Sequence, residues 1–326
     1  MRNKISTTQP SVSIVIPAYN ASRFLRGTID SILSQSFTAW ELVIVDDGST
    51  DDTLQVAGEY SHVDERICVV SQPNAGAAVA RNTGISNSSA CEFILFLDSD
   101  DRLEPTALEV LSTALQRDPD AVAAHGLARY VDLTGEDMRI GEAQRWSRDR
   151  LRVVGRTLES CDDTMPTDFS ALAFKPYIIT PATCLVRRCV VEAVGGFNNA
   201  LRNAEDYNFW LRVSLRGPIA FVPKEVALYR IHAGGKSRNN PLMARRDTIA
   251  RGQVLVTETV SPLQRATLVT GYRLKQKYDA VTRLQFSGEA LRNRRVRDWL
   301  VETARAFRCL ARAVRGMPRW SRHLTE

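Results

Sequence analysis

The sequence predicts an α/β fold in which helices flank a mostly parallel central sheet, followed by a helical C-terminal extension. Apolar, β-branched runs alternate with segments of helical periodicity over the first two-thirds of the chain. The runs are continuously apolar, as strands are when both faces of a parallel sheet are covered. The strand pattern stops near residue 235. We therefore expect an α/β domain over residues 1–235 and a basic helical region over residues 236–326.

Four strand–helix pairs open the chain. The predicted strands are "SVSIVIP" (11–17), "WELVIVDD" (40–47), "RICVVSQ" (66–72) and "EFILFLDSDD" (92–101). The predicted helices follow each of them, at residues 21–37, 49–61, 76–88 and 105–117. A polar stretch over residues 131–175 is expected to be irregular and to form a long excursion or lid. Another strand and short helix follow at 179–197, a helix at 203–217, and helices from residue 242 onward.

The composition is that of an ordinary soluble protein, with 44% hydrophobic and 25% charged residues. Six cysteines without C-x-x-C spacing predict a reducing cytoplasm, with neither a zinc site nor a disulfide framework. The sequence contains no signal-peptide pattern and no apolar run long enough to span a bilayer. The net charge of +6 comes from arginines near the end without a nucleic-acid-binding motif, so we expect no nucleic-acid partner.

Acidic residues follow two of the predicted strands. Asp46 and Asp47 end one strand, and Asp98, Asp100 and Asp101 end another. Like charges at this spacing repel unless a cation or hydrogen-bond donors compensate. Ligands of parallel α/β sheets bind beyond the carboxyl ends of the strands, where these acids collect. Since two or three carboxylates are too few to enclose a hard divalent ion, water and phosphate oxygens would complete its coordination. The sequence thus predicts a metal–diphosphate site.

Other sites for nucleotides or metals fit less well. The first strand is followed by "PAYNAS" instead of G-x-G-x-x-G, and no G-x-x-x-x-G-K-[ST] occurs, which argues against Rossmann and P-loop sites. An EF-hand loop beginning at Asp98 would carry Leu103 in place of its glycine and would follow a strand.

Seven segments together resemble the inverting family 2 glycosyltransferases, which have the GT-A fold. They are "SIVIPAYN", "ELVIVDDGSTDDT", "QPNAGAAVARNTGI", "FLDSDD", "ATCLVRR", "GGFN" and "AEDYNFWLR", in the family's order, and they cover residues 11 to 235. The resemblance implies a nucleotide-diphospho-sugar transferase.

The resemblance also implies a set of donor-binding residues. Asp47 would accept a hydrogen bond from a base N–H, whereas Asp46 would bind the donor or only brace its turn. Arg81 would project toward the base or phosphate, and Asn20 is also expected to cap the following helix. The full donor-binding set is Pro17, Ala18, Tyr19, Asn20, Asp46, Asp47, Arg81, Asp98 and Ser99.

Metal and catalytic residues are implied in the same way. Asp100 would ligate Mn²⁺ or Mg²⁺, with Asp98 beside it and His232 of "YRIH" as a further ligand. Asp206, the second acid of the E-D pair, would be the general base. Asp101 is expected either to support the metal ligands or to cap a helix.

The expected activity is transfer of a sugar from a nucleotide-diphosphate sugar, with a UDP-sugar as the expected donor, to a saccharide or lipid-linked glycan. Q-x-x-R-W, the motif of processive members, does not follow Asp206, so a non-processive enzyme of surface polysaccharide synthesis is expected. A nucleotidyltransferase and an inactive carbohydrate-binding relative remain the alternatives.

The basic C-terminal helices have two interpretations. An apolar stripe that includes Leu291, Trp299, Leu300, Phe307 and Leu310 lies among arginines, followed by Trp320. It could contact an anionic membrane at the inner face of the cell membrane, or pack on the protein's own core.

Overall fold

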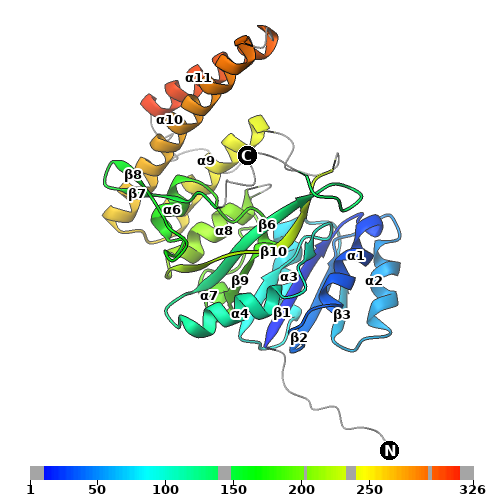
Figure 1. Cartoon of the computed structure of the whole chain (residues 1–326). Coiled ribbons are helices and arrows are strands. Elements are labelled where there is room, and N and C mark those ends of the chain that lie inside the picture. Colours follow the sequence, from blue (N-terminus) through cyan, green and yellow to red (C-terminus); the bar gives the residue numbers. More distant parts are fainter. Residues whose placement is uncertain (1–10, 139–147, 202–203, 233–239, 293–295, 316–326) are drawn as a thin grey trace, which may run out of the picture.

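The computed structural model describes residues 11–138, 148–201, 204–232, 240–292 and 296–315. Within these ranges, the central feature is an 8-stranded sheet in the order β3-β2-β1-β4-β9-β6-β10-β5. Helices cover both faces of the sheet, and a helical pair extends away from it (Figure 1). The predicted α/β architecture with a helical C-terminal extension is therefore confirmed.

The first half of the sheet is parallel, as predicted. It contains β1 (Val12–Ala18), β2 (Trp40–Asp46), β3 (Ile67–Ser71) and β4 (Phe93–Phe96). β1 lies between β2 and β4, with Val12 paired to Trp40 on one side and to Phe93 on the other. Because these strands run in one direction, the acidic residues after their carboxyl ends meet at the same edge.

The second half of the sheet is mixed in direction. It contains β9 (Cys184–Arg187), β6 (Ala123–Val131), β10 (Ile219–Arg230) and β5 (Arg102–Leu103). β9 runs antiparallel to both β4 and β6, and β5 runs antiparallel to β10. β6 and β10 are parallel. Continuous apolar runs indicate burial on both faces but carry no information on direction, which explains why the sequence did not predict the reversed strands.

Two apolar cores lie on opposite faces of the sheet. In β1, Ile14 and Ile16 point into one core and Val15 into the other, as the two-residue period of a strand requires. The first core is covered by α1 (Ser22–Leu33), α2 (Thr53–Ser61) and α4 (Ala107–Arg117). The second is covered by α3 (Ala77–Asn87), α6 (Phe169–Phe174), α7 (Arg188–Ala193) and α8 (Glu205–Ser214).

The region predicted to be an irregular excursion contains regular structure. β7 (Leu151–Val154) and β8 (Thr157–Ser160) form an antiparallel hairpin whose turn includes Gly155 at φ 58°. β7 packs against α6, and Arg150 beside it is fully buried and donates to Thr167 Oγ1 at 2.9 Å. The predicted loop was therefore wrong over residues 151–160 and over α6 at residues 169–174, because the hairpin and this short helix are too brief to show a clear period in the sequence.

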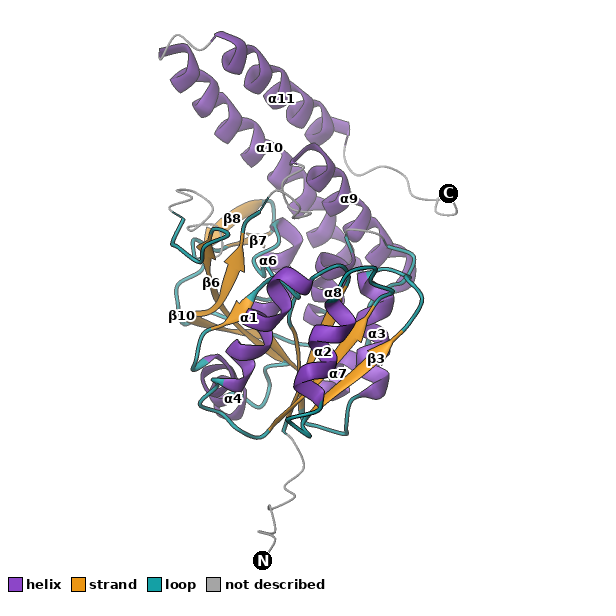
Figure 2. Ribbon diagram, turned by 90° about the vertical axis from the view of Figure 1, so that its right-hand side faces the viewer, coloured by secondary structure: helices purple, strands orange, loops and turns teal. Residues whose placement is uncertain are grey.

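The C-terminal helices pack on the α/β domain at their beginning and then leave it. They are α9 (Asn240–Thr257), α10 (Pro262–Arg292) and α11 (Val296–Arg315). Arg251 of α9 is 1% exposed and donates to the Phe174 carbonyl at 2.8 Å, and Asn208 of α8 donates to the Ala250 carbonyl at 3.1 Å. α10 and α11 then run side by side away from the sheet (Figures 1 and 2). None of the described helices is both long and apolar enough to cross a membrane.

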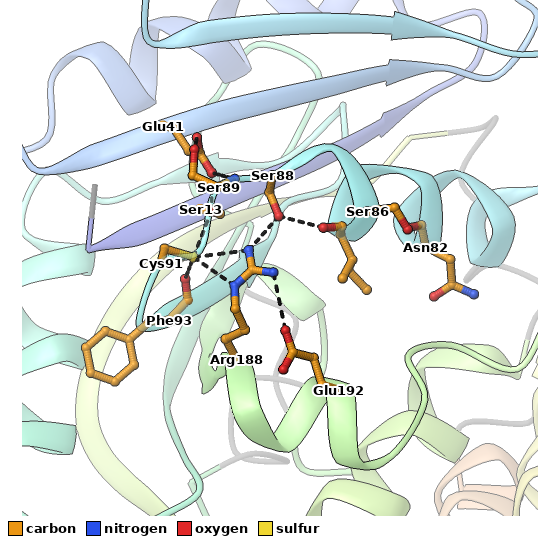
Figure 3. Close-up of polar contacts among 11 residues, drawn as sticks. Ser13, Glu41, Asn82, Ser86, Ser88, Ser89, Cys91, Phe93, Arg188 and Glu192 are labelled. Atoms are coloured by element: carbon orange, nitrogen blue, oxygen red, sulfur yellow. Dashed lines mark hydrogen bonds and ion pairs between the residues drawn. The ribbon is translucent and has the colours of Figure 1, made fainter. Parts of the chain in front are cut away.

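A network of polar contacts lies at the edge of the sheet opposite the acidic strand ends. Cys91 Sγ lies 3.4 Å from Arg188 Nε and 2.8 Å from Ser13 Oγ (Figure 3). Arg188 also donates to Ser88 Oγ at 2.6 Å and lies 3.7 Å from Glu192. These contacts connect the start of α7 to the loop before β4. Cys91 is therefore a buried residue whose thiol takes part in the packing of this edge.

We predict that Gly271→Ala will weaken the packing of α10 on α6. An added Cβ would overlap the Ala173 carbonyl and lie 3.0 Å from the Phe174 amide nitrogen, and this backbone cannot yield as a flexible side chain would. Overpacking of this kind costs about 1–3 kcal/mol. The midpoint of urea unfolding should therefore fall.

The matched control is Gly58→Ala in α2, where an added Cβ meets nothing within 4 Å. This variant should gain about 0.5–1 kcal/mol from helix propensity. Equal midpoints for Gly271→Ala and the unsubstituted protein would contradict the packing described for α10.

Candidate functional site

A cavity of 610 Å³ lies at the carboxyl ends of the parallel strands. Its walls come from the turn after β1, the turns after β2 and β4, the start of α8, the end of β10, and α9. The residues named by the sequence prediction that line it are Pro17, Ala18, Tyr19, Asn20, Asp47, Arg81, Asp98, Ser99, Asp100, Asp206 and His232. Asp46 of the predicted donor-binding set and Asp101, the predicted support of the metal ligands, are absent from the lining. The fold therefore gathers residues spread over more than two hundred positions into one cavity.

Arg81 of α3 connects two acidic segments of the cavity wall. Its guanidinium lies 2.7 Å from Asp98 after β4 and 3.5 Å from Glu205 at the start of α8. Arg81 is only 4% exposed. Burial disfavours its charge, but the two carboxylates outweigh that effect and raise its pKa above the ordinary value. Arg81 was expected to project toward a ligand, and the structure shows it in the cavity lining and bound to acids of the protein itself.

Asp100 and His232 form a pair on the same wall. His232 Nε2 lies 2.8 Å from Asp100 Oδ2, and the Phe24 ring lies 4.9 Å from the imidazole. Burial and the charge of Asp98 raise the pKa of Asp100, while His232 opposes the shift. Two ligands of one divalent ion lie about 3 Å apart when each metal–ligand distance is about 2.1 Å. The observed separation fits a shared cation.

Asp101 neither caps a helix nor lines the cavity. It is 1% exposed and accepts hydrogen bonds from the Thr180 hydroxyl at 2.7 Å and from the Arg230 amide at 3.1 Å. Arg230 also donates from Nε to the Asp100 carbonyl at 3.0 Å. Burial and the two neighbouring aspartates raise the pKa of Asp101 well above its usual range. Its helix-cap interpretation is excluded, since Thr106 is the N-cap residue of α4. Asp101 instead fixes the Asp100 turn to β10.

The two acids after β2 have different surroundings. Asp47 is 3% exposed and accepts from Gln72 Nε2 at 2.7 Å and from the Gly76 amide at 2.8 Å. It lines the cavity and orders the loop before α3. Asp46 accepts from Ser71 Oγ at 3.3 Å and from the Ser49 amide at 3.4 Å, so it braces the turn.

Asn20 does not cap α1, which corrects the expectation from sequence. The N-cap residue of α1 is Ala21, whose own side chain makes no capping hydrogen bond. Asn20 has a φ of 49° and its Oδ1 accepts from the Thr50 amide at 2.8 Å. Its side chain therefore joins the turns after β1 and β2. Tyr19 beside it is 52% exposed and faces the cavity.

Asp206 lies half-buried at the start of α8. The neighbouring Glu205 is 7% exposed, because its carboxylate is bound to Arg81. Burial, and then the charge of Glu205, raise the pKa of Asp206 to about 6, against the opposing effect of Arg81. A carboxylate with this pKa can accept a proton near neutral pH.

The sequence prediction missed other residues of the cavity wall. Arg230 and Tyr229 belong to the "YRIH" segment, so the assignment of His232 could have drawn attention to them. Thr180 and Arg246 also line the cavity. No local motif singles these two out, because long-range packing alone brings them there.

The side chains that the structure describes offer few ligands for a metal ion. The described residues include no group of three or more His, Cys, Asp and Glu side chains arranged to hold one. Asp100 and His232 would supply two ligands, with Asp98 beside them. The remaining positions would fall to water and substrate oxygens, as is usual for Mg²⁺ at phosphate sites.

Comparison with known proteins identifies the family. Residues 13–189 match the model of glycosyl transferase family 2. Over 218 residues, the chain is 32% identical to a chondroitin synthase of Escherichia coli, an alignment that covers 66% of this chain and 28% of that protein. The chain therefore spans less than a third of this curated relative.

Two solved structures share the fold. TarS 1-349 of S. aureus in complex with UDP-GlcNAc has a TM-score of 0.54 at 17% identity, covering 91% of each chain. The mannosyltransferase PcManGT of Pyrobaculum calidifontis, in complex with GDP-Man and Mn²⁺, has a TM-score of 0.60 at 17% identity, covering 97% of this chain and 89% of that one. The fold, the cavity and the match to more than half of the chain lead to one conclusion: this protein belongs to glycosyl transferase family 2.

Proposed function

We propose that this glycosyltransferase is metal-dependent and inverts the anomeric centre of a sugar donated by a nucleotide-diphosphate sugar. The observation that carries the proposal is one cavity that holds the Asp100–His232 pair and, in the same space, the half-buried Asp206. Inverting transfer needs both parts in one site: a cation for the departing diphosphate and a base for the acceptor hydroxyl.

Asp206 is the proposed general base. It takes the proton of the acceptor hydroxyl while that oxygen attacks the anomeric carbon and the bond to the nucleoside diphosphate breaks. Glu205 and Asp98 are both bound to Arg81, which leaves Asp206 as the acid of the E-D pair that faces the cavity without this ion pair. Its raised pKa suits a group that must gain a proton during each turnover.

Asp100 and His232, with Asp98 alongside, are the proposed ligands of Mn²⁺ or Mg²⁺. A divalent ion at this position would neutralise charge on the leaving diphosphate. The 2.8 Å separation of Asp100 and His232 supports a shared ion, and the similar PcManGT structure contains Mn²⁺.

The proposed donor is a UDP-sugar. TarS, which shares the fold, has been solved with UDP-GlcNAc. Pro17, Ala18, Tyr19 and Asn20 line the cavity together with Asp47, whose amide donates to the Ala18 carbonyl at 2.8 Å and whose carboxylate is the proposed acceptor of a hydrogen bond from the base. In this proposal Arg81 holds Asp98 in position to contact the donor. Ser99 lines the same cavity. Asp46 braces the turn.

We propose a saccharide or lipid-linked glycan as the acceptor, glycosylated non-processively in surface polysaccharide assembly on the cytoplasmic side of the membrane. The similarity to a chondroitin synthase supports a saccharide acceptor. The exposed face of α11 supports contact with an anionic membrane surface.

That face is left uncovered by the packing of α11 on α10. Among the side chains of α11 that the structure describes, the buried ones are small, namely Ala306, Cys309 and Ala313, and the first two form a cluster with Ala280 of α10. Phe307 and Leu310 are 64% and 37% exposed. Arg308 and Arg312 are exposed beside them. Apolar side chains flanked by arginines suit an anionic lipid surface. The side chains of Leu291, Trp299, Leu300 and Trp320 lie outside the described residues.

The functional assignment is tested by a pair of variants at the two parts of the site. Asp100→Ala should lower metal-dependent UDP affinity at least about tenfold, because a cation ligand is lost. Asp206→Asn should retain UDP affinity but lower the transfer rate by about 10²-fold or more, because the base is lost. Titration calorimetry with Mn²⁺ and a donor-turnover assay measure the two quantities. Normal turnover by Asp206→Asn would refute its role as base.

The pKa of Asp206 predicts how the rate depends on pH. Asp206 accepts a proton only when ionised, so kcat/KM should fall as pH drops below about 6. Glu205→Gln removes a neighbouring negative charge and should move this acid limb to lower pH. A kcat/KM that stays constant between about pH 5 and 8 would contradict the assignment.

Co-sedimentation with liposomes tests the membrane contact. The protein should bind vesicles rich in anionic lipid at low salt and dissociate at high salt, since each arginine near the surface contributes about 1 kcal/mol. The double variant Phe307→Ser, Leu310→Ser should bind less, whereas Leu33→Ser, which alters a 40%-exposed leucine of α1, should not. Unsubstituted protein that stays in the supernatant at low salt would exclude the contact.

A further inference from the structure

Two arginines lie close together at the edge of the candidate cavity, one on β5 and one on β10. Arg102 pairs with Leu228 across the antiparallel strands, and Arg230 lies two residues further along β10. Residues two apart on a strand share a face, so both arginines project from one face at diagonal positions. Burial lowers the pKa of Arg230, and repulsion from the charge of Arg102 lowers it as well. The two positive charges are therefore near enough to repel each other.

The guanidinium of Arg102 lies against α1 at a glycine. A Cβ built on Gly27 would lie 2.9 Å from both Cζ and Nε of Arg102, so a larger residue there would displace the guanidinium. One helical turn earlier, the Phe24 ring lies 5.4 Å from the Arg230 guanidinium and 5.4 Å from that of the exposed Arg23. The same face of α1 thus packs against both arginines and adds a third positive charge beside them.

Arg102 has no counterion in the part of the chain that the structure describes. Within that part its guanidinium makes neither a hydrogen bond nor an ion pair, and its Nε is buried without a partner. Arg129, which is opposite Leu228 on β6, differs in this respect, because it binds Glu104 at 2.9 Å and Asp137 at 3.3 Å. The charge of Arg102 is therefore left for a ligand.

Arg230 is held by main-chain carbonyls. Its Nε donates to the Asp100 carbonyl at 3.0 Å, and its Nη1 donates to the carbonyls of Asp132 and Leu133, each at 3.3 Å. Its Nη2 makes no hydrogen bond with any residue that the structure describes. These contacts fix the guanidinium without neutralising it, so the site is preorganised for an anion.

The arginine pair borders the cavity. Arg230 and Phe24 belong to the cavity lining, together with Asp206, whereas Arg102 lies outside it. The proposed donor is held by residues of the lining. An oligosaccharide acceptor whose reacting hydroxyl reaches Asp206 can extend past the edge of the cavity, where Arg102 lies.

We propose that Arg102 and Arg230 bind an anionic group of the acceptor, so that the enzyme acts on an acidic glycan. This inference rests on the proposed function. The group is an oxyanion, either a sugar carboxylate or a phosphate, since both accept paired hydrogen bonds from guanidinium groups. A neutral acceptor would leave the two positive charges uncompensated. The pair therefore selects acceptors by charge.

Three small probes separate the two sources of the anion. Methyl β-glucuronide carries a carboxylate, methyl phosphate carries a phosphate, and methyl β-glucoside is neutral. Their affinities for the full chain are measured by ligand-observed NMR, first alone and then with saturating UDP and Mg²⁺. At least one anionic probe should bind about tenfold or more tightly than the glucoside, and UDP should leave its affinity unchanged within about twofold. The tighter anionic probe identifies the chemical group.

Two variants test the arginine pair itself. Arg102→Ala should reduce the affinity of the anionic probe to within about twofold of the glucoside and should leave UDP affinity unchanged. Gly27→Ala should weaken the same probe, because the added methyl displaces the guanidinium, while alanine favours the helix itself. Arg265→Ala, which alters an exposed arginine of α10, is the matched control and should change neither affinity.

Equal affinities for charged and neutral probes, or anion binding that Arg102→Ala leaves unchanged, would overturn the proposal. Displacement of the anionic probe by UDP would overturn it as well, because the arginines would then serve the donor diphosphate. Should Arg102→Ala fail to fold, Gly27→Ala decides alone. If the unsubstituted protein binds the anionic probe but no UDP, the proposed function fails while the anion site stands, so the two failures are distinguishable.

Discussion

The site depends above all on the buried ion pairs of Arg81. One guanidinium from α3 holds Asp98, which follows β4, and Glu205, which begins α8. These acids are separated by more than a hundred residues, and without a cation between them they would repel at close range in a medium of low dielectric. Removing one partner of such a buried network leaves an uncompensated charge, which is strongly destabilising. Arg81, which belongs to neither acidic motif, therefore fixes the position of Asp98 relative to Glu205.

Other parts of the site depend on this arrangement. Because Arg81 holds Glu205, the adjacent Asp206 is directed to the cavity, and the charge of Glu205 helps to raise its pKa to about 6. Behind the cavity wall, Asp101 ties the turn that carries Asp100 to β10 and to Thr180. The C-terminal helices join the same framework through α8. The proposed metal ligands, the proposed base and the C-terminal region are thus held by buried polar contacts between segments distant in sequence.

The sequence predicted the parts of the molecule that local pattern determines. Apolar runs and helical periodicity identified β1 to β4 and their helices, and the acids at strand ends indicated the site because parallel strands end at a shared edge. The reversed direction of β9 and the hairpin at residues 151–160 were missed, since neither leaves a distinct periodicity. Asn20 was assigned as a cap from its residue type, but the turn after β2 competes for its side chain. The burial of Arg81 and the approach of Arg246 depend on tertiary contacts and have no local signature.

The central claim is that the acidic edge of the sheet binds a divalent ion together with a nucleoside diphosphate. Crystals grown with Mn²⁺ and UDP, measured at a wavelength where manganese scatters anomalously, test it most directly. One strong anomalous peak is expected within ligand distance of both Asp100 and His232, with UDP oxygens completing the coordination. A peak that contacts neither residue, or ordered UDP in the cavity without any manganese peak, would contradict it.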